Sequence, residues 1–307
     1  MKIIGINISH DCSVAFFENK KIINFFEEER LNGIKKFNPE KNSFLISLDE
    51  KLNFKPDLVC YASYGRHGKD DLKIIKKIQK QIDYPNYYFN KYDHHIYHCC
   101  SGFYFSNFEE AMAIVIDGSG AFDKDEIGYC ETQSIFYINK KRIVKKYQHM
   151  SNRIFCLSDP LIFNYSKFSL KKFKDGTEYL YSSDSTGGHS FNIACSSIGM
   201  NEGKDAGKLM GLSSYAYCSE KYELDYNKVN IAKEVQEKTF NETCFLIEKA
   251  FNYKKIKNFV LSGGFFQNCS NNFKYVKKYP ELNFFVDPVS TDAGTAIGVC
   301  IYYENYL

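Results

Sequence analysis

Apolar and polar residues follow a strand-like pattern in the first thirty positions. Apolar residues dominate 3–8, 13–17 and 22–26, and the polar stretch 19–21 separates the last two runs. Short apolar runs divided by turn residues are typical of β-strands. We therefore predict three strands that run back and forth as a meander.

The same order of features returns in the middle of the chain. Apolar residues at 111–116 run into Asp117-Gly118, a second run at 133–137 leads to a polar turn at 139–141, and a further run begins at Ile143. Two copies of one meander, each followed by helical and strand segments, predict an α/β protein with two similar lobes. A ligand is expected in the cleft between them.

The remaining pattern divides into three parts. Between 151 and 187 the periodicity fades and aromatic residues mix with lysines, which predicts an inserted loop or subdomain. A helical period spans 229–250, and its expected buried face contains Ile231, Val235, Phe245 and Leu246. A short buried strand at 259–261 then runs into a glycine turn.

Composition narrows the class of protein. The chain has 307 residues, a formal charge of +3, and 11 cysteines without a Cys-x-x-Cys pair. The cysteine spacing argues against a disulfide framework or a structural zinc site and indicates reduced thiols. No apolar stretch reaches the length of a membrane span, and the N-terminus reads as a strand, so we expect a cytoplasmic protein with no membrane partner. The small net charge does not require nucleic acid as a partner.

Two histidines have the spacing of metal ligands. His94 and His98 are four residues apart, so on a helix their rings lie on one face and can bind one ion. The alternative is a pair of histidines with no shared ligand, and the spacing alone does not separate the two readings. His95, between them, is expected to face elsewhere.

Glycine-rich turns follow several predicted strands. Asp117-Gly118-Ser119-Gly120 ends one strand, and His10-Asp11-Cys12-Ser13 has the matching place in the first copy. Strand ends in open α/β sheets bind ligands, and a glycine turn can cradle a phosphate, although an ordinary tight turn remains the alternative. The segment 203–212 is rich in glycine and lysine but lacks P-loop spacing, which leaves an anion-binding loop or a solvated loop.

Seven motifs occur in one order along the chain. They are His10-Asp11-x-Ser13, Glu28-Glu29-Arg30, His94-His95-x-x-His98, Asp117-Gly118-x-Gly120, Gly207-Lys208-x-Met210-Gly211-Leu212, Ser262-Gly263-Gly264-x-x-x-Asn268-Cys269 and Asp292-Ala293-Gly294. In this order they resemble the carbamoyltransferases of antibiotic and nodulation-factor biosynthesis, and less closely the enzymes that place threonylcarbamoyl on tRNA. The resemblance runs from Ile3 to about Gly298.

The resemblance implies a fold and a metal site. The fold is the two-lobed actin-like kinase (ASKHA) fold, made of duplicated RNase H-like lobes at 1–110 and 111–292, with the C-terminal helix at 293–307 packed on the first lobe. In this family two spaced histidines and a late aspartate bind the ion, and these correspond to His94, His98 and Asp292. Such ligands suit iron or another divalent ion.

Adenylate-binding and catalytic residues follow from the same resemblance. The adenylate is expected against Gly118, Ser119, Lys208, Gly211, Ser262, Gly263, Gly264 and Asn268. His10 is the candidate base for the acceptor hydroxyl, Asp117 orients that hydroxyl, and Asp11 is a further catalytic candidate. Lys36 stands where the family usually has a histidine, and a lysine there would polarise the carbamoyl oxygen.

The expected activity is transfer of a carbamoyl group from carbamoyl-adenylate to an acceptor hydroxyl. Full-length family members carry a second, YrdC-like domain that makes this donor from ATP and carbamoyl phosphate. The chain ends without one, so a separate YrdC-like protein is expected as a partner.

The acceptor is the least determined part of this expectation. Lysines and aromatic residues mix at 163–174, which suits phosphates and unstacked bases, and the scarcity of arginine suggests an AT-rich genome. We favour hydroxymethylcytosine in DNA, modified by a virus-encoded enzyme in the host cytoplasm. The alternatives are a small-molecule natural product, tRNA threonylcarbamoyl transfer, and a non-catalytic nucleotide-binding subunit.

Overall fold

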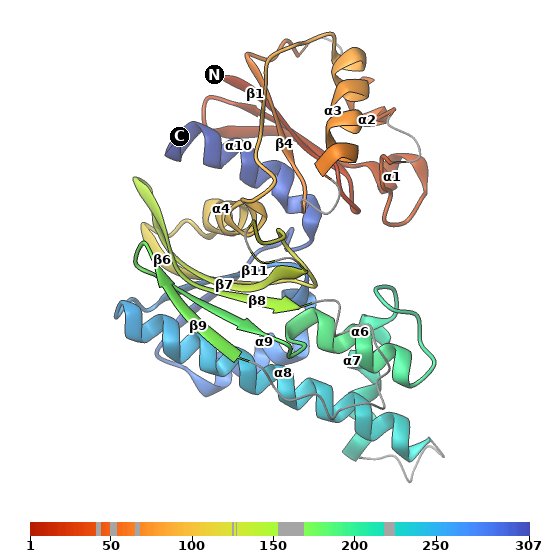
Figure 1. Ribbon diagram of the computed structural model, residues 1–307, viewed down its shortest axis with the longest axis vertical. Coiled ribbons are helices and arrows are strands. Elements are labelled where there is room, and N and C mark those ends of the chain that lie inside the picture. The colour runs from red at the N-terminus through yellow and green to blue at the C-terminus, as the bar shows by residue number, and fades with distance from the viewer. Residues whose placement is uncertain are drawn as a thin grey trace.

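The chain folds into two lobes, each based on one β-sheet (Figure 1). The computed structural model describes residues 1–40, 44–49, 54–64, 68–124, 126, 128–152, 169–217 and 225–307. The first sheet uses strands between Lys2 and Phe89, and the second uses strands between Glu110 and Val286. Within the described part of the chain, no helix is long and apolar enough to cross a membrane.

The first lobe contains a five-stranded sheet. Its strands are β1 (Lys2–Asn7), β2 (Ser13–Glu18), β3 (Lys21–Glu27), β4 (Leu58–Ala62) and β5 (Tyr87–Phe89), and its helices are α1 (Glu28–Asn32), α2 (Ile46–Asp49) and α3 (Gly68–Ile82). The order across the sheet is β3-β2-β1-β4-β5. The first three strands are antiparallel, which confirms the predicted meander, and β4 pairs parallel with β1.

The second lobe contains a seven-stranded sheet. Its strands are β6 (Glu110–Ile116), β7 (Tyr129–Asn139), β8 (Arg142–Asn152), β9 (Ser169–Lys174), β10 (Thr177–Ser182), β11 (Asn258–Ser262) and β12 (Asn283–Val286). The order is β12-β11-β6-β7-β8-β10-β9, and the antiparallel strands β6, β7 and β8 form the second meander. The helices of this lobe are α6 (Gly187–Ser197), α7 (Ala206–Ser213), α8 (Tyr226–Tyr253) and α9 (Cys269–Lys278), with 3-10 turns η1 (Ser214–Tyr217) and η3 (Gly264–Gln267).

Two helices lie between the sheets: α4 (His94–Ser106) and α10 (Thr295–Tyr306), which follows the 3-10 turn η4 (Asp292–Gly294) (Figure 1). One apolar cluster joins them to β1 and β2 on one side and to β6 and β7 on the other. The two helices approach closely at Gly298, where an added Cβ would lie 1.9 Å from the carbonyl oxygen of Tyr97. This central layer carries His94, His98 and Asp292 between the lobes.

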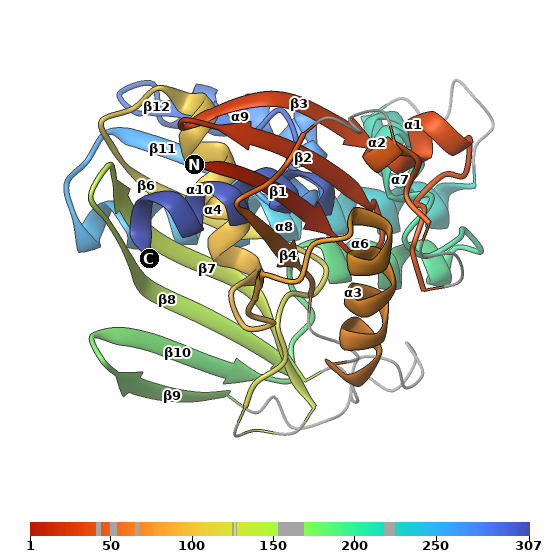
Figure 2. The same ribbon diagram turned by 90° about the horizontal axis from the view of Figure 1, so that it is seen from above.

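The structure corrects two expectations about the second lobe. The described end of the 151–187 segment is a β9–β10 hairpin that extends the main sheet at its edge, so it is no separate loop there (Figure 2). The residues 153–168, which include Phe163, Tyr165, Lys167 and Phe168, lie outside the described residues. On α8, Val235 and Leu246 are buried as predicted, Ile231 is half-buried, and Phe245 is 58% exposed, because it lies on the solvent side of the helix.

Candidate functional site

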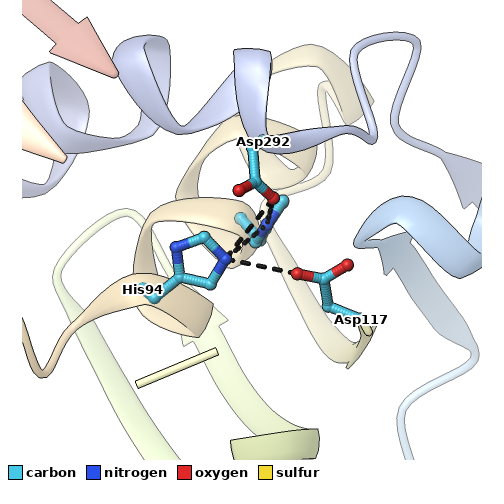
Figure 3. Close-up of side chains that lie close together, drawn as sticks. His94, Asp117 and Asp292 are labelled. Atoms are coloured by element: carbon cyan, nitrogen blue, oxygen red, sulfur yellow. Dashed lines mark hydrogen bonds and ion pairs between the residues drawn. The ribbon is translucent and has the colours of Figure 1, made fainter. Parts of the chain in front are cut away.

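Four side chains from three parts of the chain meet between the lobes. His94 and His98 come from the first turns of α4, Asp292 begins η4, and Asp117 follows the last residue of β6. Figure 3 shows the His94 ring facing both carboxylates. The helical spacing places the two imidazoles on one face, as the sequence predicted, and the fold brings the late aspartate to them.

The polar atoms of this cluster lie close together. His94 Nε2 is 3.3 Å from Asp117 Oδ2, 3.5 Å from Asp292 Oδ1 and 3.2 Å from His98 Nε2. His98 Nε2 is also 3.5 Å from Asp292 Oδ1. One ligand atom from each of the four residues lies within 4.8 Å of all the others. The geometry therefore directs two nitrogen and two oxygen donors at one point.

The cluster is buried, and its charges depend on one another. Burial lowers the pKa of His94, but the carboxylates of Asp292 and Asp117 outweigh this effect and raise the pKa to about 10. Burial raises the pKa of Asp292, yet His10 and His94 hold it well below its usual range. Without an ion, the carboxylates are therefore balanced by protonated imidazole, and binding of a metal would release protons.

The donor set fits a divalent metal ion. Two imidazole nitrogens and two carboxylate oxygens suit iron, manganese or zinc, and four protein ligands can leave positions open on an ion of higher coordination number. The Nδ1 atoms of His94 and His98 find no hydrogen-bond partner among the described residues, so both rings present Nε2 to the cluster. Asp117 was predicted to orient the acceptor, and its place as a fourth donor was not predicted.

His10 and Asp11 lie at the edge of the cluster. His10 Nε2 is 3.5 Å from Asp292 Oδ2, and its Nδ1 is 3.1 Å from Asp11 Oδ2. Ser9 Oγ donates to Asp292 Oδ2 at 3.0 Å. The charge of Asp292 raises the pKa of His10 to about 9. Since 48% of the His10 side chain is exposed, its ring can reach a ligand in the cleft.

A cavity of about 540 Å³ opens from the cluster between the lobes. The first lobe contributes His10, Asp11 and Lys36 to its lining, and the second contributes Asp117, Gly118 and Ser119. This volume lies in the range of small-ligand pockets. The predicted cleft therefore exists, and it joins the two meander turns to the cluster.

The second-lobe wall of the cavity presents main chain. Gly118 and Ser119 lie in the turn after β6, and Gly188 lies in the first turn of α6. An added Cβ on Gly188 would lie 3.3 Å from the amide nitrogen of Gly118, so the helix start and the turn are packed together. Exposed amides at a glycine turn and a helix N-terminus favour anions such as phosphate. Gly188 was missed because its signal, paired glycines at a helix start, lay at the boundary of the 151–187 segment interpreted as an insertion.

Four of the predicted adenylate residues do not line the cavity. Ser262 is fully buried and donates to Asp287 Oδ2 at 2.8 Å. Gly263 has a φ of +99°, and a Cβ there would lie 2.3 Å from the carbonyl oxygen of Ile116, so only glycine fits this turn. Lys208 points outwards and pairs with Asp205 at 2.8 Å. Gly211 belongs to the same helix, α7, and does not line the cavity.

Gly264 and Asn268 do line the cavity. The Asn268 side chain is already engaged, because its Oδ1 caps α9 by accepting from Asn271 N at 3.1 Å and its Nδ2 donates to Gln236 Oε1 at 3.0 Å. Asn268 is therefore held rigidly at the cavity wall. Gln236, the residue that fixes it, gave no signal in the sequence beyond a polar position on a buried helix face.

Lys36 connects the lobes. Its Nζ donates to the carbonyl oxygen of Gly203, and both residues line the cavity. Its backbone amide donates to Glu29 Oε2 at 2.8 Å, and its φ is +56°. The Lys36 ammonium group therefore bridges the first-lobe and second-lobe walls of the cavity.

Sequence comparison matches the chain to part of a longer protein. No protein-family model matches the chain. An uncharacterized protein of Methanocaldococcus jannaschii is 29% identical over an alignment of 314 positions, which covers 97% of this chain and 56% of that protein. The chain therefore spans little more than half the length of this relative.

Solved structures resemble the whole chain at low sequence identity. Full-length HypF, in a phosphate- and nucleotide-bound form, superposes with a TM-score of 0.59 at 15% identity, covering 98% of this chain and 55% of HypF. HypF of T. kodakarensis gives 0.58 at 14% identity, covering 100% and 48%. Component A of the (R)-2-hydroxyglutaryl-CoA dehydratase of Acidaminococcus fermentans gives 0.50 at 12% identity, covering 98% and 97%. The chain has the two-lobed, actin-like ASKHA fold, and it is structurally similar to HypF.

Proposed function

We propose that this protein transfers a carbamoyl group from carbamoyl-adenylate to an acceptor hydroxyl. One observation carries the proposal: His94, His98, Asp117 and Asp292 meet in a nucleotide-sized cleft of an ASKHA fold, on the motifs that resemble carbamoyltransferases. HypF, which has a similar fold, was solved with phosphate and nucleotide bound, and this favours a nucleotide in the cleft.

The donor would lie along the second-lobe wall. The amides of the Gly118–Ser119 turn and the start of α6 would bind its phosphate, and Gly264 and Asn268 would shape the wall beside the nucleoside. This position directs the carbamoyl end towards Asp117 and His10. The donor and the acid-base residues would then meet at the cluster.

The reaction forms one bond and breaks one. The acceptor oxygen attacks the carbamoyl carbon, the bond from that carbon to the phosphate oxygen breaks, and adenylate leaves with the electron pair. The hydroxyl proton passes to His10 in its neutral form, which is the minor form near neutral pH because the charge of Asp292 raises the pKa of the ring to about 9. Asp11, 3.1 Å from His10 Nδ1, orients the ring. A divalent ion bound by the four cluster residues would supply positive charge to polarise an oxygen of the donor.

A partner protein would supply the donor. The similarity to HypF covers 55% of that protein, and it does not test whether a second protein makes carbamoyl-adenylate. We propose a separate YrdC-like protein that makes it from ATP and carbamoyl phosphate. A labile mixed anhydride reacts with water, so direct passage between the two proteins favours transfer over hydrolysis.

Hydroxymethylcytosine in DNA is our candidate acceptor, and a small hydroxylated natural product is the alternative. The β9 edge carries exposed lysines and Phe173, which is 76% exposed, as a nucleic-acid surface would require. However, Lys171 and Lys172 form ion pairs with Glu178 and Glu126, which lowers the charge offered to phosphates. Threonylcarbamoyl transfer to tRNA and a non-catalytic nucleotide-binding role are further outcomes of the test below.

Reconstituted transfer tests the proposal. The protein is mixed with ATP, carbamoyl phosphate and a YrdC-like protein, together with hydroxymethylated DNA, tRNA or hydroxylated small molecules, and the products are weighed. We expect an acceptor heavier by one carbamoyl group, dependent on both proteins. Threonylcarbamoylated tRNA, made when threonine and bicarbonate replace carbamoyl phosphate, would move the protein to the other enzyme class. Nucleotide binding without turnover of any acceptor would indicate the non-catalytic role.

A further inference from the structure

A second polar layer lies behind the turn that carries Asp117. His95 on α4 and Glu131 on β7 are both fully buried. His95 Nδ1 is 2.9 Å from Ser134 Oγ, and Ser134 Oγ donates to Glu131 Oε1 at 3.2 Å. Gln148 Nε2 also donates to Glu131 Oε1, at 2.7 Å. One carboxylate oxygen therefore receives several donors.

The single hydrogen of Ser134 fixes the tautomer of His95. A hydroxyl has one hydrogen to donate, and the charged carboxylate of Glu131 is a stronger acceptor than a neutral imidazole. Ser134 therefore accepts from His95, whose hydrogen lies on Nδ1. The other ring nitrogen, Nε2, is left with a lone pair that needs a donor.

Two acceptors then face the same place under Gly120. Among the described residues, neither His95 Nε2 nor Glu131 Oε2 has a hydrogen-bond partner. The position that a Cβ on Gly120 would take lies 2.9 Å from His95 Nε2 and 2.9 Å from Glu131 Oε2, so the two acceptors are separated by no more than twice this distance, which one water can bridge. Buried polar atoms in folded proteins are nearly always satisfied, by protein or by an ordered water.

We propose that one buried water donates its two hydrogens to His95 Nε2 and Glu131 Oε2 and, with these residues, positions the Asp117–Gly120 turn. A water suits two acceptors because it is the smallest group with two hydrogens to give. A cation is not needed, because Lys145 Nζ lies 3.4 Å from Glu131 Oε1 and already balances its charge.

The layer is tied directly to the cleft. Gly120 N donates to Glu131 O at 2.6 Å, and Asp117 N donates to Thr132 O at 3.1 Å, so both ends of the turn are hydrogen-bonded to the same part of β7. Glu131 and His95 do not line the cavity; they are positioning residues that act through Asp117 and Gly118. The link to catalysis rests on the proposed function, but the water and the cluster geometry do not.

Two measurements on the unmodified protein test the water itself. Long-range proton–nitrogen NMR of the seven histidine rings, with His95→Gln to assign one set, should show His95 protonated on Nδ1 with Nε2 accepting a hydrogen bond. A crystal structure at atomic resolution should show one ordered water bonded to both acceptors. A hydrogen on Nε2, or a direct bond between Nε2 and Oε2, overturns the proposal.

Paired variants test the positioning role. Cobalt(II) binding to the cluster, followed by its absorption, is the measurement, and it needs no substrate. Glu131→Leu should weaken cobalt binding by about 10- to 100-fold, the usual effect of losing a supporting hydrogen bond behind a metal ligand. Glu131→Gln should restore most of it, since its amide can donate towards His95 Nε2 in place of the water. Cobalt binding unchanged in Glu131→Leu would overturn the role.

Two glycine-to-alanine substitutions distinguish the surroundings of the proposed water from another position in the same turn. Gly120→Ala should weaken cobalt binding because its methyl would crowd both acceptors at 2.9 Å and hinder a water between them, whereas Gly118→Ala should not, because a Cβ there meets nothing within 4 Å. Equal effects from both substitutions would contradict the proposal. If these results hold and carbamoyl transfer still fails, only the proposed function is lost.

Discussion

The two turns that meet at the cluster occupy equivalent places in the two lobes but are constructed differently. The first-lobe turn after β1 holds charged side chains, and Asn7 fixes it by donating to the carbonyl oxygens of His10 and Asp11 at 3.0 and 3.1 Å. The second-lobe turn after β6 has glycine at two of four positions and is fixed by main-chain bonds to β7. A side chain fixes the first turn, whereas main-chain bonds fix the second, which carries Asp117 between β6 and its glycines.

This difference indicates a division of labour. A turn with His10 and Asp11 supplies groups that exchange protons, whereas a turn with bare amides lets a phosphate approach the backbone. A duplicated meander thus gives two copies of one scaffold with separate chemistry. Loss of the metal should therefore abolish transfer. A substitution in the first turn should lower turnover, and one in the second turn should weaken donor binding.

The largest effect is expected from the cluster, where the two turns meet. His94→Ala or His98→Ala should abolish transfer and remove the metal, since each deletes one of four donors directed at the same point. Folding should survive, as judged by circular dichroism. The control is His149→Gln, a substitution of another buried histidine outside the cluster, and this variant should keep the metal. Full metal occupancy in His94→Ala, measured by elemental analysis, would exclude this assignment.

His10→Gln tests the first turn. We expect kcat to fall by about 10²- to 10⁴-fold, the usual contribution of a general base, with little change in the KM for carbamoyl-adenylate. The amide keeps the size and polarity of the ring edge but cannot take up a proton. Steady-state kinetics with varied donor give the result, and a raised donor KM with unchanged kcat would assign His10 to binding.

Gly118→Ala tests the second turn with the opposite expectation. Its methyl would project into the cavity, so the KM for the donor should rise about 10-fold, the lower end of the effect of one misplaced methyl group in a binding pocket, while kcat changes less. The added Cβ meets no protein atom within 4 Å, and stability should be unchanged. The kinetics of Gly118→Ala and His10→Gln are measured in parallel. If both substitutions change the same kinetic parameter, the two turns do not have separate roles.

Much of this arrangement could be predicted from the sequence, because local sequence patterns determine the strands, the turns and the histidine spacing. Period-two and turn signals gave both meanders, and the four-residue spacing placed His94 and His98 on one face of α4. Glycine-rich motifs marked the turns, yet they did not distinguish Gly118, which faces the cavity, from Gly263, which presses against Ile116. The backbone requires glycine at Gly263, where a Cβ would clash with Ile116, but not at Gly118, where a Cβ meets no protein atom. The sequence shows neither this difference nor the side on which the ligand lies.

Long-range contacts explain what the sequence could not reveal. The closeness of Asp117 to the histidines depends on α4 crossing the second sheet, and the contact of Ser9 with Asp292 joins residues 283 positions apart. Lys208 looked like an anion ligand, but its neighbour Asp205 pairs with it on the outside of α7. The fold as a whole decides which of several similar side chains face the cleft.

The smallest effect is expected at the outer edge of the second lobe, far from the two turns. Replacing Lys171, Lys172 and Lys174 on β9 with alanine should reduce the salt dependence of DNA binding only slightly. Two of the three lysines already pair with glutamates, at 3.8 Å for Lys171 and 2.5 Å for Lys172, so the slope of log affinity against log salt should change by about one rather than three.

The measurement compares hydroxymethylated and unmodified DNA over a salt series, with the partner protein present. A triple alanine variant at Lys73, Lys76 and Lys77 on α3 is the control, because it removes equal charge from the other lobe. A Phe173→Ala variant should cost about 1–3 kcal/mol in affinity with no change in slope if the ring stacks on a base. If the native protein binds DNA undetectably or without salt dependence, the acceptor belongs to the small-molecule class. The exposed β9 edge would then have no part in the reaction, and the two turns alone would define the substrate site.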